Sequence, residues 1–183
     1  LAVLFIEGDW SPDRTLGDHC GSCERCVVAC PTRAIGSNGN IDARKCISYW
    51  SIEHKGAVPT AIMNRMGDWF FGCDDCQTSC PHNAKASPSV EDDFLPKNAW
   101  IELDKLLSQN NEEMMDRFIG TPLRRPKAHG LRRNALIVLG NSAEESALPI
   151  IEPYLDSSDN TLKQTAMWAL SNLEATLGSL DHQ

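Results

Sequence analysis

The stretch Cys20-Gly-Ser-Cys23-Glu-Arg-Cys26-Val-Val-Ala-Cys30-Pro31 decides how this chain is built. It spaces four cysteines as C-x2-C-x2-C-x3-C and ends on a Cys-Pro step. Three thiolates at this spacing can wrap one cubane iron–sulfur cluster in a tight loop, and the fourth points away along the start of a helix. The pattern is typical of ferredoxins that bind two [4Fe–4S] clusters, so we expect a chain that passes electrons one at a time.

A second cysteine run completes the ligand set. Cys73, Cys76 and Cys80 are spaced C-x2-C-x3-C before Pro81, and Cys46 stands alone between the runs. In two-cluster ferredoxins the last cysteine of a run binds the other cluster. The expected ligands of the first cluster are Cys20, Cys23, Cys26 and Cys80, and those of the second are Cys73, Cys76, Cys30 and, by elimination, Cys46.

Two other uses of eight cysteines fit the spacing less well. Two zinc sites with four cysteines each would need two separated C-x2-C pairs per site, and a run of four that ends in Cys-Pro matches this poorly. A disulfide framework is expected mainly in small secreted chains, and the sequence shows no signal peptide.

Composition and charge place the chain among ordinary globular proteins. Of its 183 residues, 42% are hydrophobic and 23% are charged, and the net charge of −8 argues against a uniformly basic nucleic-acid coat. The longest apolar run, Leu1–Ile6, is too short to cross a membrane, so we expect a cytoplasmic location and no membrane partner. This run predicts a buried strand, and because Leu1 is no initiator we expect the C-terminal part of a longer protein.

The character of the sequence changes at a linker, which predicts two domains. Residues 16–86 alternate short strand and helix patterns around the cysteine loops, as expected of an α+β ferredoxin-like domain. Residues 87–97 are rich in Ser, Pro and acidic residues, and residues 98–183 show helical patterns alone. Strands are expected over residues 1–10 and at Ile35, and helices over 27–29, 44–50, 60–66, 98–107, 112–118, 131–139, 144–155 and 162–173.

An aromatic insert separates Cys46 from Cys73. It holds Ser48-Tyr-Trp-Ser-Ile-Glu-His-Lys-Gly56 and Asp68-Trp-Phe-Phe-Gly72, and it is longer than ligand geometry requires. The insert could be a cap that keeps water from a cluster, or a wall for a second cofactor or a substrate. The residues leave both readings open.

The helical part contains a repeat at an offset of 31 residues. Four residues, Leu131, Ala135, Leu139 and Asn141, match Leu162, Ala166, Leu170 and Asn172. Leucines at these positions supply an apolar stripe and the alanines permit close helix contact. A repeated helix pair of this length is typical of a short HEAT-type solenoid, although two amphipathic helices can also match by chance.

A basic segment precedes the first repeated helix. Its cations are Arg124, Arg125, Lys127, Arg132 and Arg133, with no acidic residue among them. Arginine forks bind phosphate oxygens in pairs, so the segment predicts contact with RNA or another polyanion. The alternatives are a solvated basic face or ion pairs with the acidic linker residues 91–93.

Taken together, these motifs resemble the epoxyqueuosine reductase family. The resemblance lies in the first cysteine run and its continuation to Ile35, in Lys45-Cys-Ile-Ser-Tyr49 and Ser51-Ile-Glu-His-Lys-Gly56, and in Phe71-Gly-Cys-Asp-Asp-Cys-Gln77 with Cys80-Pro81. Further matches are Arg132-Arg-Asn-Ala135 and Leu139-Gly-Asn141, which are similar to the HEAT-like segment of this family.

The resemblance implies an oxidoreductase of queuosine biosynthesis that uses cobalamin and two [4Fe–4S] clusters. Members reduce epoxyqueuosine to queuosine in the anticodon stem-loop of tRNA, with electrons from an external donor. On this reading Ser48, Cys73 and Asp74 would contact the corrinoid. Lys55 and the basic segment would contact tRNA.

The resemblance also implies that a catalytic part is missing. Residues 1–15 would end the family's N-terminal corrinoid-binding domain, which supplies the proton donor, so no catalytic residue is expected in this chain. We expect a monomer that does not turn over alone. Two readings stay open: an electron-transfer ferredoxin module on a helical-repeat scaffold, or part of another corrinoid reductase such as a reductive dehalogenase.

Overall fold

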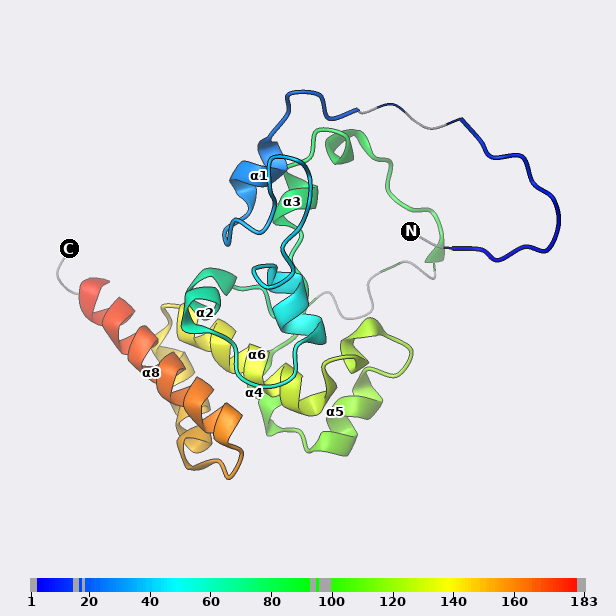
Figure 1. The fold of residues 1–183 in the computed structure, drawn as a ribbon. Helices are drawn as coiled ribbons and strands as arrows, with labels where there is room; N and C mark the ends of the chain where they lie inside the picture. Colours follow the sequence, from blue (N-terminus) through cyan, green and yellow to red (C-terminus); the bar gives the residue numbers. More distant parts are fainter. Residues whose placement is uncertain (1–2, 15–16, 18, 93–94, 96–99, 181–183) are drawn as a thin grey trace.

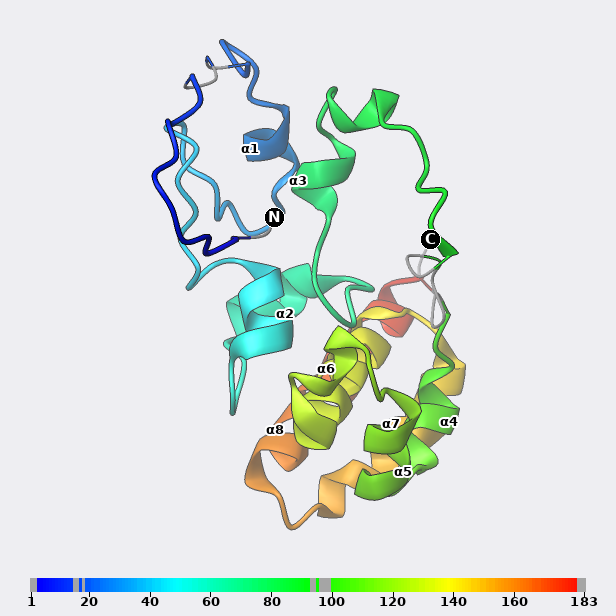
Figure 2. The ribbon, with the colours of Figure 1, turned by 90° about the vertical axis from the view of Figure 1, so that its right-hand side faces the viewer.

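A computed structural model describes residues 3–180, except 15–16, 18, 93–94 and 96–99. The described residues form two units (Figures 1 and 2). The cysteine unit comprises residues 19–86 and carries both cysteine runs, and the helical unit comprises residues 100–180. The long helix α6 of the helical unit packs against both α2 of the cysteine unit and α8, so it lies at the centre of the molecule.

Short helical turns build the cysteine unit, because its chain is repeatedly redirected between ligand loops. They are α1 (Arg25–Ala29), the π-helical turn η1 (Tyr49–Glu53), α2 (Thr60–Met66), α3 (Asp75–Thr78) and the 3-10 turn η2 (Asn83–Lys85). Helix α2 spans the predicted residues and ends at Gly67, whose φ of +55° favours glycine. The helix expected over 44–50 is instead displaced to η1.

The α+β character expected of this unit is not confirmed. Its described residues contain one antiparallel bridge, Ile35 to Ile41, and no longer strand. The buried strand expected over residues 1–10 is wrong for residues 3–10, which form no strand; Val3, Leu4 and Phe5 are 78%, 81% and 97% exposed. A strand needs a neighbour to accept its backbone hydrogen bonds, and no described segment supplies one here.

The helical unit follows the predicted pattern more closely. Its elements are α4 (Leu103–Ser108), α5 (Asn111–Arg117), the 3-10 turn η4 (Pro122–Arg124), α6 (Lys127–Asn141), the 3-10 turn η5 (Glu145–Ala147), α7 (Leu148–Ile151), the 3-10 turn η6 (Glu152–Asp156) and α8 (Asn160–Leu180). The single helix expected over 144–155 is divided into three pieces. Pro149 and Pro153 lack the N–H that a continuous helix would use.

The repeated positions meet similar surroundings in α6 and α8. Leu131 and Ala135 of α6 are buried, as are their counterparts Leu162 and Ala166 of α8. Gly140 brings the two helices close together, because a Cβ at this position would lie 2.7 Å from the Cα of Ala169. The helix pair that the repeat predicts is therefore packed along its small residues.

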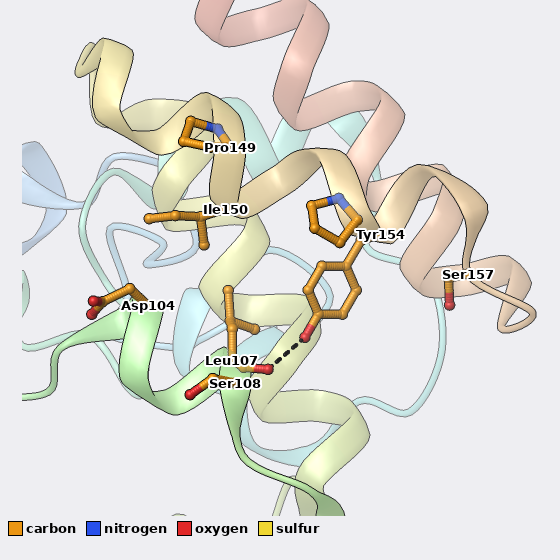
Figure 3. Close-up of a pocket in the computed structure, with 8 residues that line it drawn as sticks. Asp104, Leu107, Ser108, Pro149, Ile150, Tyr154 and Ser157 are labelled. Atoms are coloured by element: carbon orange, nitrogen blue, oxygen red, sulfur yellow. Dashed lines mark hydrogen bonds between the residues drawn. The ribbon is translucent and has the colours of Figure 1, made fainter.

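An open apolar hollow lies on the outer side of the helical unit, between α4 and the α7–η6 segment (Figure 3). The hydroxyl of Tyr154 donates a hydrogen bond of 3.1 Å to the carbonyl of Leu107 and so ties η6 to α4. Asp104 is the one charged residue among the described residues that line the hollow.

Among the described residues, no helix is both long and apolar enough to span a lipid bilayer.

The two units share one apolar core. Ile137 of α6 packs into a buried cluster of the cysteine unit, whose members are Ile47, Val58, Ile62, Met63 and Met66. At its edge, the indole N–H of Trp168 donates to the amide oxygen of Asn64, 3.2 Å away. The contact between the two units is therefore packed like the interior of a single domain.

A buried guanidinium crosses the same interface. Arg133 of α6 has no exposed surface, and it donates to the carbonyls of Trp50, His54 and Gly56 at 2.7–2.9 Å and to the side-chain oxygen of Asn134. Burial lowers the pKa of Arg133 to about 10, so the group stays cationic at neutral pH. No carboxylate of the described residues is among its hydrogen-bond partners, so carbonyl dipoles compensate this charge.

Gly140→Ala should destabilise the chain by about 1–2 kcal/mol, because the new methyl group meets backbone and side-chain atoms of Ala169. Gly178→Ala is the matched control, since a Cβ there meets nothing within 4 Å inside helix α8. In the control, the free energy of unfolding should rise by up to about 1 kcal/mol, because Ala has a higher helix propensity than Gly. Denaturant unfolding followed by circular dichroism measures both, and equal gains for both variants would refute the close α6–α8 contact.

Arg133→Met should lower the free energy of unfolding by about 3 kcal/mol or more, because several buried carbonyls lose their donors. The exposed Lys163→Met on α8 should change it by less than about 0.5 kcal/mol. The same denaturant titration measures the free energy of unfolding of both variants. If the Arg133 variant lost no more of it than the Lys163 variant, the buried network would be contradicted.

Candidate iron–sulfur site

Three cysteines from the two runs and the isolated Cys46 line one pocket of the cysteine unit. They are Cys30, Cys46, Cys73 and Cys76, which are the expected ligands of the second cluster. The remaining lining is largely apolar, with Ala34, Ile35, Ile41 and Ile47 among its members. Cysteines up to 46 positions apart in the sequence thus line one largely apolar pocket, a suitable lining for a cubane cluster.

Local turns determine how the pocket cysteines are presented. Cys30 ends α1 and Cys76 lies inside α3, and these two helices pack side by side (Figure 1). The backbone N–H of Ala34 donates to the sulfur of Cys30 at 3.2 Å, and the hydroxyl of Thr32 lies 3.6 Å from the same sulfur. N–H groups directed at a sulfur are a feature that tunes cluster potentials.

The pKa values of the thiols in this pocket are shifted in different directions. Burial raises the pKa of Cys73 to about 12, and the neighbouring carboxylate of Asp75 contributes to the shift. Burial also raises the pKa of Cys76. At Cys30 burial acts in the same direction, but the hydrogen bonds from Ala34 and Thr32 outweigh it and lower the pKa. Cys73 therefore becomes a thiolate at neutral pH only when a metal displaces its proton.

The other four cysteines differ in exposure. Cys20 and Cys23 are exposed, and Cys26 and Cys80 are partly buried. Two contacts bring the end of the second run to the start of the first: the His82 ring lies 6.4 Å from the His19 ring, and its Nε2 is 3.4 Å from the His19 carbonyl. This places the segment after Cys80 beside Cys20, as the expected exchange of ligands requires.

Among the described residues, no three His, Cys, Asp or Glu side chains converge closely enough to hold a single metal ion. In a cubane each thiolate binds a different iron, so the sulfurs surround a volume and do not meet at a point. A cubane site therefore does not require such convergence on one point.

The three residues expected to contact a corrinoid lie near one another. The hydroxyl of Ser48 donates to the carbonyl of Cys73 at 3.5 Å, although 25 residues separate them. Asp74 follows directly and precedes α3, where its exposed side chain forms no capping hydrogen bond. Its carboxylate is thus directed at no group of its own helix.

The aromatic insert forms a compact ring cluster on the π-helical turn η1. The ring of Trp50 lies 4.3 Å from that of His54 and 5.5 Å from that of Tyr49. The indole N–H of Trp50 donates to the carbonyl of Arg44, and burial lowers the pKa of His54. Single π-helical turns are frequent at functional sites.

The structure divides the predicted tRNA-contacting residues. Lys55, Arg124, Arg125 and Lys127 are exposed. Arg125 pairs with Glu53 of η1, not with the described acidic linker residues Glu91 and Asp92. Arg132 is partly buried and donates to the side chain of Asn111 and the carbonyl of Gln109. These last contacts tie α6 to α5.

Arg133 corrects the prediction. The basic segment predicts that it faces tRNA, but it is fully buried and its donors are used by carbonyls of the cysteine unit. The adjacent Arg132 and Arg133 point to different surroundings because neighbours on a helix lie about 100° apart. Charge clustering in sequence therefore overstates the basic surface.

Ser51 is a residue that sequence reasoning missed. It is completely buried, and its hydroxyl donates to the carbonyl of Ile47 at 2.9 Å and accepts from the N–H of Gly72 at 3.0 Å. Its neighbours in sequence carry no charge or periodicity signal. The only available hint was a small polar residue inside an otherwise aromatic insert.

Comparisons with known proteins agree with this site. The family of 4Fe-4S double cluster binding domains matches residues 19–83. The chain is 39% identical over 155 residues to an epoxyqueuosine reductase of Pseudomonas aeruginosa, covering 83% of this chain and 42% of that protein. An epoxyqueuosine reductase of Xanthomonas campestris is 37% identical over 174 residues, covering 93% and 49%.

Solved structures give the same family. An epoxyqueuosine reductase crystallised with an epoxyqueuosine-modified tRNA-Tyr stem loop superposes with a TM-score of 0.82 at 30% identity, covering 90% of this chain and 44% of that one. The enzyme of Streptococcus thermophilus gives a TM-score of 0.80 at 29% identity, covering 95% and 47%. The chain spans about half the length of the curated relatives it matches. By these similarities over most of its length, the chain belongs to the epoxyqueuosine reductase family.

Proposed function

We propose that this chain is the electron-relaying, tRNA-contacting part of an epoxyqueuosine reductase, which reduces epoxyqueuosine to queuosine in tRNA. One observation carries the proposal: cysteines of both runs, together with Cys46, line a single apolar pocket in a chain of this family. A ferredoxin module that serves another reductase would share the pocket. The family relationship favours the tRNA-modifying reaction.

Each cluster would be held by cysteines of both runs. We assign Cys20, Cys23, Cys26 and Cys80 to one cluster and Cys30, Cys46, Cys73 and Cys76 to the other. When bound, such clusters supply one-electron transfer at potentials that burial and hydrogen bonds to sulfur adjust. The more exposed set, which includes Cys20 and Cys23, is the natural entry for electrons from an external donor. The pocket set is the better shielded from water.

Cobalamin would be shared with the part of the relatives that this chain does not span. Ser48, Cys73 and Asp74 fit a role as corrinoid contacts, since Ser48 bonds to Cys73 and Asp74 has an uncapped, exposed carboxylate beside them. Their contribution would be to hold the cofactor beside the pocket cysteines. The chain alone, without the remaining half, should not turn over.

The tRNA surface would consist of the exposed cations at the junction of the two units. Arg125 pairs with Glu53 two residues before Lys55, so η4 and the turn after η1 lie together. Arg124, the last residue of η4, and Lys127, the first residue of α6, flank Arg125 in the sequence. The solved relative with a bound stem loop supports tRNA as the partner.

We further propose that the protein is monomeric and cytoplasmic, and that the repeat formed by α6 and α8 is HEAT-like.

Anaerobic reconstitution should load about eight irons per chain, because two cubane clusters carry four each. Cys46→Ser should remove about four of them by opening the pocket cluster, and Cys20→Ser, the matched control in the other set, should remove the other four. Iron and sulfide assays with EPR of the reduced protein measure this. Zinc in place of iron, or loss of all iron from either variant alone, would overturn the ligand assignment.

Removing exposed cations should weaken binding of a tRNA anticodon stem-loop and flatten its salt dependence. The variant Arg124→Ala/Lys127→Ala should lower the slope of log K against log salt by about one for each phosphate that the protein no longer neutralises. Lys105→Ala on α4, an exposed cation outside the proposed surface, is the matched control. Fluorescence anisotropy at several salt concentrations measures both. Unchanged slopes in the double variant would favour a plain electron-transfer module.

A further inference from the structure

Ser51 joins the two chain segments that carry Cys46 and Cys73. Its hydroxyl donates to the carbonyl of Ile47, the residue after Cys46, and accepts from the N–H of Gly72, the residue before Cys73. The side chain is completely buried, so water cannot replace either hydrogen bond. One hydroxyl therefore sets the distance between two of the four pocket cysteines at the level of their backbones.

The helical unit holds Ser51 in place. The side-chain amide of Asn134, on α6, donates to the carbonyl of Ser51 at 2.7 Å and to the carbonyl of Phe70 at 3.0 Å. Both amide hydrogens are thus used. Phe70 lies two residues before Gly72, so Asn134 holds both of the segments that Ser51 joins.

Arg133 orients Asn134. The side-chain oxygen of Asn134 accepts from Nε and Nη2 of Arg133, which leaves the amide nitrogen facing the cysteine unit. The remaining donors of Arg133 go to three carbonyls of η1 and the turn that follows it. All five N–H groups of the Arg133 guanidinium are hydrogen-bonded, which fixes its orientation. The orientation of the Asn134 amide is fixed with it.

We propose that Ser51, Asn134 and Arg133 form a positioning relay through which the helical unit sets the geometry, and hence the reduction potential, of the cluster held by Cys30, Cys46, Cys73 and Cys76. The inference rests on the cluster assignment proposed above. None of the three relay residues is a cluster ligand. They act through the backbone next to Cys46 and Cys73, and cluster potentials respond to the hydrogen bonds and solvent exposure that this backbone controls.

The relay predicts an effect confined to one cluster. The residues next to Cys20, Cys23 and Cys26 take no part in its hydrogen bonds, so the exposed cluster should be indifferent to it. A merely stabilising contact between the units would affect both clusters together, through unfolding, or neither. The distinction can be read spectroscopically.

The test uses Ser51→Ala and Asn134→Ala in the anaerobically reconstituted chain. Asn172→Ala is the matched control, because the Asn172 amide also donates to a carbonyl and a side-chain oxygen, but those belong to Gly140 and Asn141 of α6 and not to the segments next to Cys46 and Cys73. Iron content and EPR-monitored redox titration report on each cluster. Circular dichroism verifies that each variant is folded.

Both relay variants should displace the midpoint potential and EPR signal of one cluster, or lose up to about four of about eight irons, while the other cluster keeps its wild-type signal. The Asn172 variant should keep both signals. Wild-type potentials in a folded Ser51→Ala, or equal shifts of both clusters, would overturn the relay. Should Asn134→Ala fail to fold, Ser51→Ala decides alone, since it leaves the α6 contacts intact. A wild-type chain without two clusters would instead refute the proposed function.

Discussion

The joint between the two units depends on a buried positive charge that has no acidic partner. Taking a guanidinium out of water is costly, and only complete hydrogen bonding offsets the cost. Arg133 meets this condition with the carbonyls of Trp50, His54 and Gly56 and the amide oxygen of Asn134. These carbonyls belong to η1 and the turn after it, so the aromatic insert can take its observed shape only while α6 is packed against it.

This constraint gives the helical unit a part in the iron–sulfur site. Helix α6 presents Arg133 and Asn134 to the insert, and Ile137 to the apolar core below it, from one continuous face. The insert in turn lies between Cys46 and Cys73. A charge pair on the surface could be lost with little effect, whereas this interior contact couples helix packing to the position of the pocket cysteines.

Several elements could be predicted because their causes are local. Helix α2 follows from its apolar spacing and from Gly67, and α6 and α8 follow from a repeat in which the same small and apolar positions recur. Two predictions failed where the cause is not local. The apolar run over residues 3–6 predicts a buried strand without regard to whether a neighbouring strand exists. The basic segment predicts one continuous surface, although helix geometry turns Arg133 of α6 inward, whereas Arg125 precedes α6 and is exposed.

The sequence by itself determined the chemistry of the site and its family. Eight cysteines at these spacings specify which loops can wrap a cubane, and this information is local because ligand loops are only a few residues long. The spacing also predicts which cysteines line the pocket, whereas what holds them there was decided by tertiary structure alone. Ser51 and Asn134 are separated from each other by 83 residues, and a hydrogen bond over that distance exists only once α6 has packed against the insert.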